Sequence, residues 1–274
     1  MKRSFLARLQ RTALVSLVGA LFLLLVVPSL QLLVLGPQGY AVALATPQSS
    51  MFWIQGHTLL FLLYRLTLLL GFALLLGLPF ALFRIIVAQE IVGRAELAAE
   101  EEQSADGSEP EETTEPETEN GMPAFAWRGK GFAVIAGWTG LLGLLFLAGG
   151  TLASTIFLWS SASIASAQVP VPDNFASVSS LFAILTYTIG GGLLAFSLLF
   201  FGIVITRSGR KLWPDSWVAF GYIALAIGAI ASGSAVQVTL APTGGQASLT
   251  TPTILLYAIW SLWFSGMVLR LRPE

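Results

Sequence analysis

The stretch "LLFLLYRLTLLLGFALLLGLPF", residues 59–80, is almost entirely apolar. A helix that crosses a lipid bilayer needs about 20 consecutive apolar residues, and this stretch is long enough. One cation, Arg65, interrupts it, although a charged side chain is costly inside hydrocarbon. The stretch therefore predicts a membrane-spanning helix and raises the question of what Arg65 contacts.

Similar apolar stretches recur along the chain. The predicted spans are approximately residues 13–35, 58–83, 132–158, 178–205, 217–238 and 252–269. Only 11% of the 274 residues are charged, whereas soluble domains carry about 25%. We therefore expect an all-α polytopic membrane protein with six transmembrane helices.

The first apolar stretch also resembles a signal peptide, because cations precede it and Ala43-Leu44-Ala45 resembles a cleavage site. Its apolar run is longer than the roughly 7–15 residues of a signal peptide, and that site lies well beyond the run. We expect a retained span.

The distribution of positive charge predicts the orientation. With six spans, every Lys and Arg except Arg65 falls on one side of the membrane. These cations are Lys2, Arg3, Arg8, Arg11, Arg84, Arg94, Arg128, Lys130, Arg207, Arg210, Lys211, Arg270 and Arg272. Loops 36–57, 159–177 and 239–251 contain no cation and one acid, Asp173. Because cytoplasmic loops are enriched in Lys and Arg, both termini are predicted to be cytoplasmic.

Twelve of the fifteen acidic residues lie between Glu90 and Glu119. Segment 98–121 is acidic, contains proline and lacks aromatic residues, so it cannot bury enough apolar surface to order itself. We expect a disordered cytoplasmic loop, or alternatively a docking segment for a basic partner. The chain then divides into residues 1–97 with spans 1 and 2, the loop 98–121, and residues 122–274 with spans 3 to 6 of the same bundle.

Small residues recur at near-heptad spacing in spans 3, 4 and 5. The sets are Ala136, Gly140, Gly143, Gly150 and Ser154; Ala183, Thr186, Gly190 and Ser197; and Gly221, Ala224, Gly228, Ala231 and Ala235. Small faces let helices approach closely in lipid, so we interpret them as packing seams. A glycine-lined transport path is the alternative. Such paths usually carry ionisable or amide side chains at mid-depth, and spans 3 to 6 have none there.

Prolines and tryptophans add local expectations. Pro79 should kink span 2, and Pro28 should do the same in span 1. Four tryptophans are expected to anchor the helices at the membrane interfaces: Trp53, Trp159, Trp213 and Trp217.

Several kinds of chemistry are excluded or disfavoured. The chain has no cysteine and one histidine, His57, so thiolate chemistry, iron–sulfur clusters and a His-rich metal site are excluded. No nucleotide-binding or GxSxG motif occurs. The charge balance gives no reason to expect nucleic acid as a partner. We expect no enzymatic activity, no cofactor and no metal.

Arg65 has two interpretations. It either extends its long side chain toward the interface, capped by loop carbonyls or by Asp173, or it binds an anionic headgroup or small anion in an outward cavity. Tyr64 and His57 share a neighbouring stripe of the helix and would form the rim of that cavity.

Two stretches resemble a known family. They are "LLYRLTLLLGFALLLGLPFAL", with Arg65 early in span 2, and "LLFFGIVITRSGRKLWPDSWVAFGYIALAIGAI", where Arg207-Ser208-Gly209 leads to Pro214. Together they resemble the bacterial six-helix membrane proteins grouped as domain of unknown function 4386, over about residues 8 to 270. The acidic insert and the extra residues between Gly209 and Pro214 depart from that pattern. The resemblance implies a fold and no activity.

The sequence thus favours a non-enzymatic scaffold or accessory subunit of a complex in a bacterial inner membrane, in contact with the lipid bilayer and other membrane subunits. The alternative is a protein that binds or transports small anions or lipid headgroups at Arg65.

The orientation can be tested with introduced cysteines. On intact cells, an impermeant thiol reagent should label cysteines placed at Ser50, Asn174 and Ser248. Cysteines at Ser104 and Ser208 should react only after the membrane is permeabilised. The reverse pattern would refute the orientation.

Overall fold

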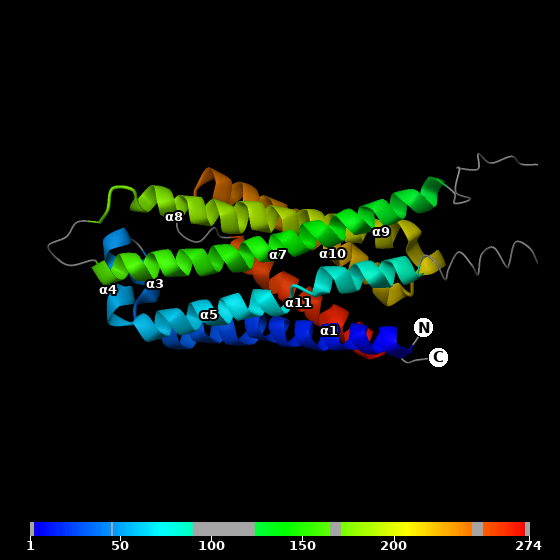
Figure 1. The fold of residues 1–274 in the computed structure, drawn as a ribbon, viewed down its shortest axis with the longest axis horizontal. Helices are drawn as coiled ribbons and strands as arrows, with labels where there is room; N and C mark the ends of the chain where they lie inside the picture. Colours follow the sequence, from blue (N-terminus) through cyan, green and yellow to red (C-terminus); the bar gives the residue numbers. More distant parts are fainter. Residues whose placement is uncertain (1–2, 45, 90–123, 165–170, 243–248, 272–274) are drawn as a thin grey trace, which may run out of the picture.

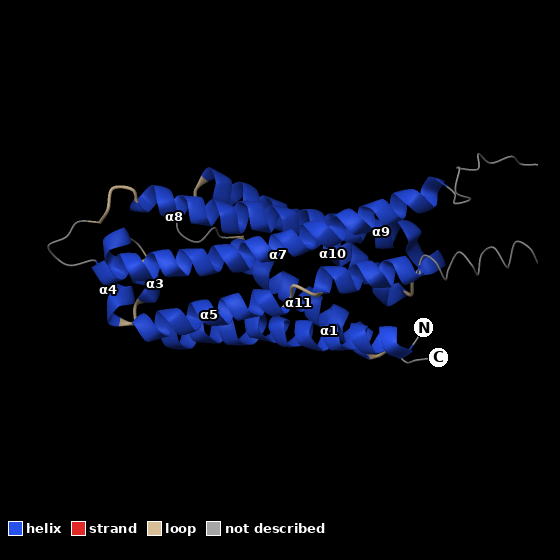
Figure 2. Ribbon diagram, viewed as in Figure 1, coloured by secondary structure: helices blue, strands red, loops and turns tan. Residues whose placement is uncertain are grey.

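The fold is that of a computed structural model, which describes residues 3–44, 46–89, 124–164, 171–242 and 249–271. Within these ranges the regular structure is helical and no strand occurs (Figure 2). Segment 98–121, predicted to be a disordered loop, lies outside the described residues.

Six helical segments are long and apolar enough to cross a membrane. They are Phe5–Leu35, Thr58–Gln89, Gly131–Ile164, Phe175–Arg210, Asp215–Leu240 and Thr250–Leu269. Each contains most or all of one predicted span and most extend well beyond it, so the predicted number of spans and the all-α class are confirmed. The chain has the architecture of a multi-pass membrane protein.

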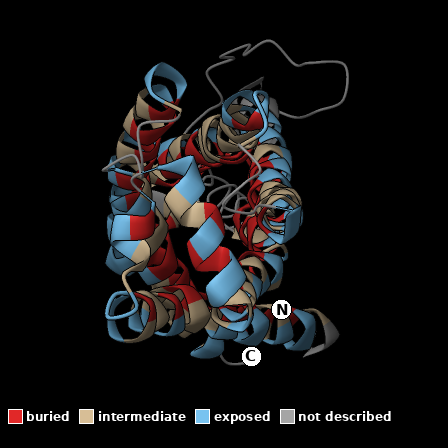
Figure 3. Cartoon of the chain, turned by 90° about the vertical axis from the view of Figure 1, so that its left-hand side faces the viewer, coloured by how far each residue is buried: buried red, intermediate tan, exposed pale blue. Residues whose placement is uncertain are grey.

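The helices form an elongated bundle (Figure 1). Their bounds are α1 Arg3–Leu21, η1 Phe22–Val26, α2 Val27–Ser29, η2 Leu30–Leu35, α3 Tyr40–Ala43, α4 Pro47–Gly56, α5 Thr58–Leu74, a helix over 78–89, α7 Ala124–Ile164, α8 Phe175–Ala183, η3 Ile184–Gly190, α9 Gly191–Leu212, α10 Asp215–Leu240 and α11 Thr250–Leu269. The η segments are π-helical turns. Buried residues face the inside of the bundle and exposed residues face outward (Figure 3).

Both chain ends lie at the same end of the bundle, which we call the terminal end; α3 and α4 lie at the far end (Figure 1). The Gln10 side-chain amide donates to the Leu271 carbonyl at 3.0 Å, which joins the start of α1 to the end of α11. Exposed arginines lie in the first half of α1, in the helix over 78–89, in the last turns of α9 and directly after α11: Arg8, Arg11, Arg84, Arg207, Arg210 and Arg270. The far end of the bundle is the predicted outer end, and the side of a membrane that each end meets stays a prediction.

Span 1 passes through Pro28 without a break. A proline lacks the N–H that an α-helix needs, and here π-helical turns flank it. The Val27 N–H bonds to the Phe22 carbonyl, five residues back. These wider turns accommodate the proline, and π-bulges are a known cause of helix bending.

Span 2 is broken rather than only kinked. Helix α5 ends at Leu74, and the chain becomes helical again at residue 78. Pro79 cannot donate to the Leu75 carbonyl, and the Leu78 N–H donates to that carbonyl instead at 3.0 Å. The predicted effect of Pro79 is thus confirmed, and the break precedes the proline by one turn.

The small residues of α7 pack against η3 and α9, as the seam prediction requires. A Cβ added to Gly143 would lie 2.8 Å from the Leu194 nitrogen and 2.9 Å from the Gly190 oxygen. A Cβ on Gly150 would overlap Thr186. Further along the same interface, the buried Ser197 hydroxyl donates to the Ala136 carbonyl at 2.7 Å. Here the two backbones are in direct contact.

A second seam joins α9 and α10. A Cβ on Gly228 would lie 2.8 Å from Leu199 Cγ, and one on Gly221 would lie 2.9 Å from Ile205 Cγ2. Gly202, which was not predicted to belong to a seam, also does: a Cβ on Gly202 would lie 2.8 Å from the Gly221 oxygen. The packing interpretation of these small faces is therefore confirmed.

Three of the four tryptophans predicted as interfacial anchors are buried against protein. Trp159 is exposed, but Trp53, Trp213 and Trp217 are at least nine-tenths buried against protein. Trp213 and Trp217 pack on each other with ring centroids 5.3 Å apart. Hydropathy places such rings near an interface but cannot distinguish a lipid contact from a helix contact.

Two glycines of α7 provide a matched test of the first seam. Gly143→Ala should lower stability by about 1–3 kcal/mol, because its methyl group overpacks the contact with Gly190. Gly149 has nothing within 4 Å of an added Cβ, so Gly149→Ala should be neutral or stabilising by up to about 1 kcal/mol. Thermal unfolding in detergent measures both, and equal effects would contradict the seam.

Candidate functional site

Arg65 lies on α5 and reaches toward α7. Its Nη2 donates to the Ser154 hydroxyl at 3.0 Å, and Ser154 in turn donates to the Thr151 carbonyl at 3.0 Å. The guanidinium also lies 5.7 Å from the centre of the Phe61 ring, one helical turn back. The cation is thus held between two helices within the bundle.

The guanidinium is only partly satisfied. It has five N–H donors, and one described hydrogen bond, to Ser154, uses one of them. The Arg65 Nε atom is buried and has no hydrogen-bond partner among the described residues. An unpaired buried donor costs about 1–3 kcal/mol, and more when it is charged.

The predicted caps for Arg65 are therefore wrong. No ion pair joins Arg65 to Asp173, although the structure describes both residues, and the hydrogen bond goes to a helix side chain instead of a loop carbonyl. Ser154, assigned from its spacing to a packing seam, is the partner. The sequence could not indicate this, because the choice depends on how α5 and α7 are rotated.

Two tyrosines lie near Arg65, Tyr40 on α3 and Tyr64 on α5, and a third, Tyr187 on η3, lies near these two tyrosines. Arg65 interacts electrostatically with Tyr40 and Tyr64, and Tyr187 interacts with both of those tyrosines. The Tyr40 and Tyr64 rings meet edge to face at 6.1 Å. Their hydroxyls and that of Tyr187 form no hydrogen bond to another described residue. We call Arg65, Tyr40, Tyr64, Tyr187 and Ser154 the arginine cluster.

Tyr40 is a neutral hydrogen-bond donor at physiological pH, as an ordinary tyrosine is. Removal from solvent raises the pKa of the Tyr40 phenol, and the positive charge of Arg65 opposes part of that rise. Tyr40 was missed by the sequence analysis. Gly39, directly before Tyr40, could have indicated a turn at this point. It has a φ of 76°, which glycine adopts readily, and the turn leads the chain back toward the bundle.

The predicted rim residues have different positions. Tyr64 belongs to the arginine cluster, but no hydrogen bond or ring contact joins His57 to Arg65. The His57 ring stacks on Trp53 with centroids 4.7 Å apart, and Trp53 Nε1 donates to the Gln38 carbonyl at 2.7 Å. Trp53 also contacts Tyr40 at 4.7 Å. His57 thus supports the far-end loop that positions Tyr40.

Arg65 does not line either of two pockets that lie among the described residues. One is a cavity of about 30 Å³ in the middle of the bundle, and Tyr187 is part of its wall. The other is an open groove of about 500 Å³ at the terminal end, between Trp217 of α10 and Arg270 after α11. Neither pocket is therefore the outward cavity that was predicted around Arg65. The described residues also hold no cluster of three or more His, Asp or Glu side chains that could bind a metal.

No protein-family model, curated protein or solved structure matches this chain. The resemblance to the domain of unknown function 4386 proteins thus stays a prediction.

The stability effect of Arg65 can be predicted from its contacts. Arg65→Leu should be neutral or raise the melting temperature, because it removes a partly buried cation whose Nε has no partner among the described residues, while Ser154 keeps its bond to Thr151. Arg65→Lys should stay within a few degrees of wild type. Thermal unfolding in detergent measures both. A collapse of the Lys variant would show that the guanidinium geometry holds the bundle together.

Proposed function

We propose that this chain is a non-enzymatic protein of a bacterial inner membrane, with cytoplasmic termini, that binds an anionic phosphate-type group at Arg65. The supporting observation is the partly satisfied guanidinium, whose buried Nε has no protein partner among the described residues. A charged donor in this state is stabilised by an anion more than by any neutral group.

The chemistry of the cluster favours a phosphate or carboxylate. A guanidinium offers parallel N–H donors that match two oxygens of one anion. The hydroxyl groups of Tyr40 and Tyr64, which lie near Arg65, add further hydrogen-bond donors. No Asp or Glu is hydrogen-bonded to Arg65 among the described residues, so a bound anion would not compete with a carboxylate of the protein for that cation.

The depth of Arg65 suits a group near the predicted outer interface. Arg65 is seven residues from Thr58, the first residue of α5, which is about 10 Å along the helix. An arginine side chain can extend over most of that distance. The phosphate could belong to a lipid headgroup or be free in solution.

Binding without transport is the favoured form of this proposal. The described interior cavity of about 30 Å³ is far too small for a solute such as phosphate, and the seams of α7, α9 and α10 are in backbone contact. These observations also favour the second candidate, a scaffold or accessory subunit whose partners are other membrane proteins. Affinity purification in mild detergent with mass spectrometry tests that candidate.

Anion binding at Arg65 can be measured by thermal unfolding in a maltoside detergent, which contains no phosphate. Adding phosphatidylglycerol to the micelles should raise the melting temperature of wild type, because a ligand that binds only the folded state stabilises it. Arg65→Leu should lose most of that rise, and Arg65→Lys should lose part of it since an ammonium cannot bind two oxygens in parallel.

Inorganic phosphate added to the same micelles without lipid distinguishes the two sources. A rise with inorganic phosphate that depends on Arg65 indicates a free anion, and a rise only with phosphatidylglycerol indicates a headgroup. Arg84→Leu removes an exposed cation at the opposite end and should keep the Arg65-dependent rise. If Arg65→Leu responds to both probes as wild type does, the proposal is wrong.

A further inference from the structure

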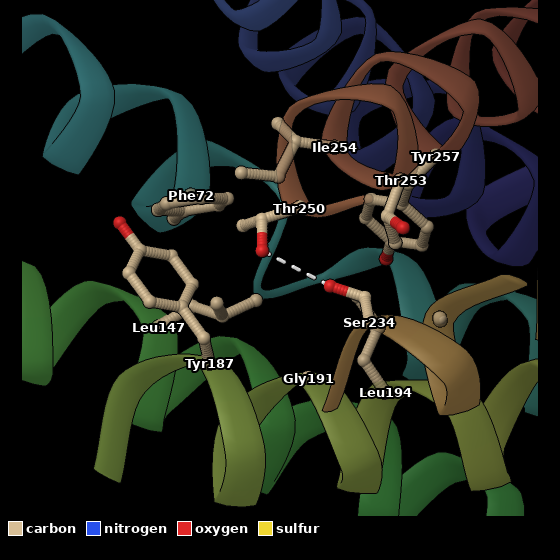
Figure 4. Close-up of a pocket in the computed structure, with 11 residues that line it drawn as sticks. Phe72, Leu147, Tyr187, Gly191, Leu194, Ser234, Thr250, Thr253, Ile254 and Tyr257 are labelled. Atoms are coloured by element: carbon tan, nitrogen blue, oxygen red, sulfur yellow. Dashed lines mark hydrogen bonds between the residues drawn. The ribbon is translucent and has the colours of Figure 1, made fainter. Parts of the chain in front are cut away.

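The small cavity lies where α5, α7, α10, α11 and the η3–α9 helix meet, in the middle of the bundle (Figure 4). Its wall contains the apolar side chains of Phe72 and Ile254 as well as several hydroxyl-bearing side chains. The polar lining comes mainly from α10 and α11, which contribute Ser234, Thr250, Thr253 and Tyr257. The cavity therefore has a polar side within an apolar interior.

Tyr257 is the residue on that side that lacks a partner. It is only 2% exposed, and its hydroxyl has no hydrogen-bond partner among the described residues. The Ser261 hydroxyl, one turn further along α11, lies close enough to interact with the Tyr257 phenol, but it donates its proton to the Tyr257 carbonyl at 2.7 Å. In Figure 4 the Tyr257 hydroxyl points toward Ser234. A buried phenol normally finds a hydrogen-bond partner.

Possible acceptors lie across the cavity. The Ser234 and Thr250 hydroxyls share a hydrogen bond of 3.0 Å (Figure 4). Thr253 donates its own proton to the Leu249 carbonyl at 2.6 Å. Each hydroxyl oxygen has two lone pairs, so all three retain accepting capacity. None of them bonds directly to Tyr257.

We propose that this cavity binds one or two water molecules that connect the Tyr257 hydroxyl to the Ser234–Thr250 pair. A cavity needs about 10–15 Å³ of such volume for each water, and about 30 Å³ is present. Water both accepts from the phenol and donates to the hydroxyls. An apolar occupant would leave Tyr257 unpaired, and an ion would lack an oppositely charged side chain in the lining.

The water joins α10 to α11 close to the residue at which α11 begins. Thr250 and Thr253 lie in the first turn of α11, and Ser234 lies within the last two turns of α10. Closer to the terminal end, the same helices are held by apolar contact, with Phe220 stacked on Trp260 at 4.4 Å. The water-mediated contact thus holds the N-terminal half of α11 against α10, and the stacked rings of Phe220 and Trp260 hold the rest of α11.

A double-mutant cycle of Tyr257→Phe and Ser234→Ala tests this proposal in detergent. If a water connects the two hydroxyls, Tyr257→Phe lowers the melting temperature by several degrees, and the double variant loses less than the sum of the single losses. The control is Tyr222→Phe, on the exposed face of α10, which should leave the melting temperature unchanged. A melting temperature for Tyr257→Phe at or above that of wild type, or strictly additive losses, would overturn the proposal.

A measurement on the wild-type protein avoids any dependence on how the variants fold. Water-edited solid-state NMR follows magnetisation from water protons to the hydroxyl-bearing ring carbon of Tyr257. Its build-up should be much faster than that of the Phe264 ring, which is fully buried and has no polar atom. Equal build-up at the two rings would show that the cavity is dry.

Discussion

Direct backbone contact between α7 and the helix formed by η3 and α9 is the interaction on which the rest of the bundle depends. Apolar side chains are about as stable in lipid as against another helix, so the hydrophobic effect does not drive helices together in a bilayer. They associate by close packing and hydrogen bonds instead. Gly143 and Gly190 allow that approach. The Ser197 bond to the Ala136 carbonyl becomes possible only because the backbones are so near. Since α10 joins α9 by a second seam, α7, α9 and α10 form one layer against which the remaining helices pack.

The break in span 2 packs against α7, one helix of that layer. Pro79 packs where Gly140 of α7 leaves room, and a Cβ on Gly140 would lie 2.9 Å from the proline ring. Beyond the break, the helix over 78–89 meets α7 through the rings of Phe80 and Trp138. Before it, α5 packs on α1, where Gly19 and Gly71 are in contact. Helix α5 also contacts α7, through the Arg65–Ser154 hydrogen bond, so span 2 lies between α1 and α7 and small residues on both neighbours receive it.

Features that leave a pattern within one helix were predictable from the sequence, whereas the pairing of particular side chains from two helices was not. Span positions follow from apolar length, and the seams follow from the spacing of small residues. The turn at Gly209 has a φ of 53°, which explains why the "RSG" pattern needs a glycine there. The rotation of α5 against α7 decides that Arg65 meets Ser154 and that His57 does not join it. The burial of Trp53 likewise depends on where the far-end loop folds back. No periodicity within a single segment encodes such relations.

The length of a side chain determines which polar groups in the bundle need a partner from outside their own helix. Ser261 and Ser265 are fully buried, yet each donates to the carbonyl four residues back. A serine or threonine can satisfy itself in this way at little cost. A tyrosine hydroxyl lies too far from its own backbone to do so, and a guanidinium has more donors than nearby carbonyls can accept. Tyr257 and Arg65 therefore cannot be satisfied by the helices that carry them. A water at one and an anion at the other are partners of the right chemistry, and Tyr187 lies next to both because it belongs to the arginine cluster and lines the cavity.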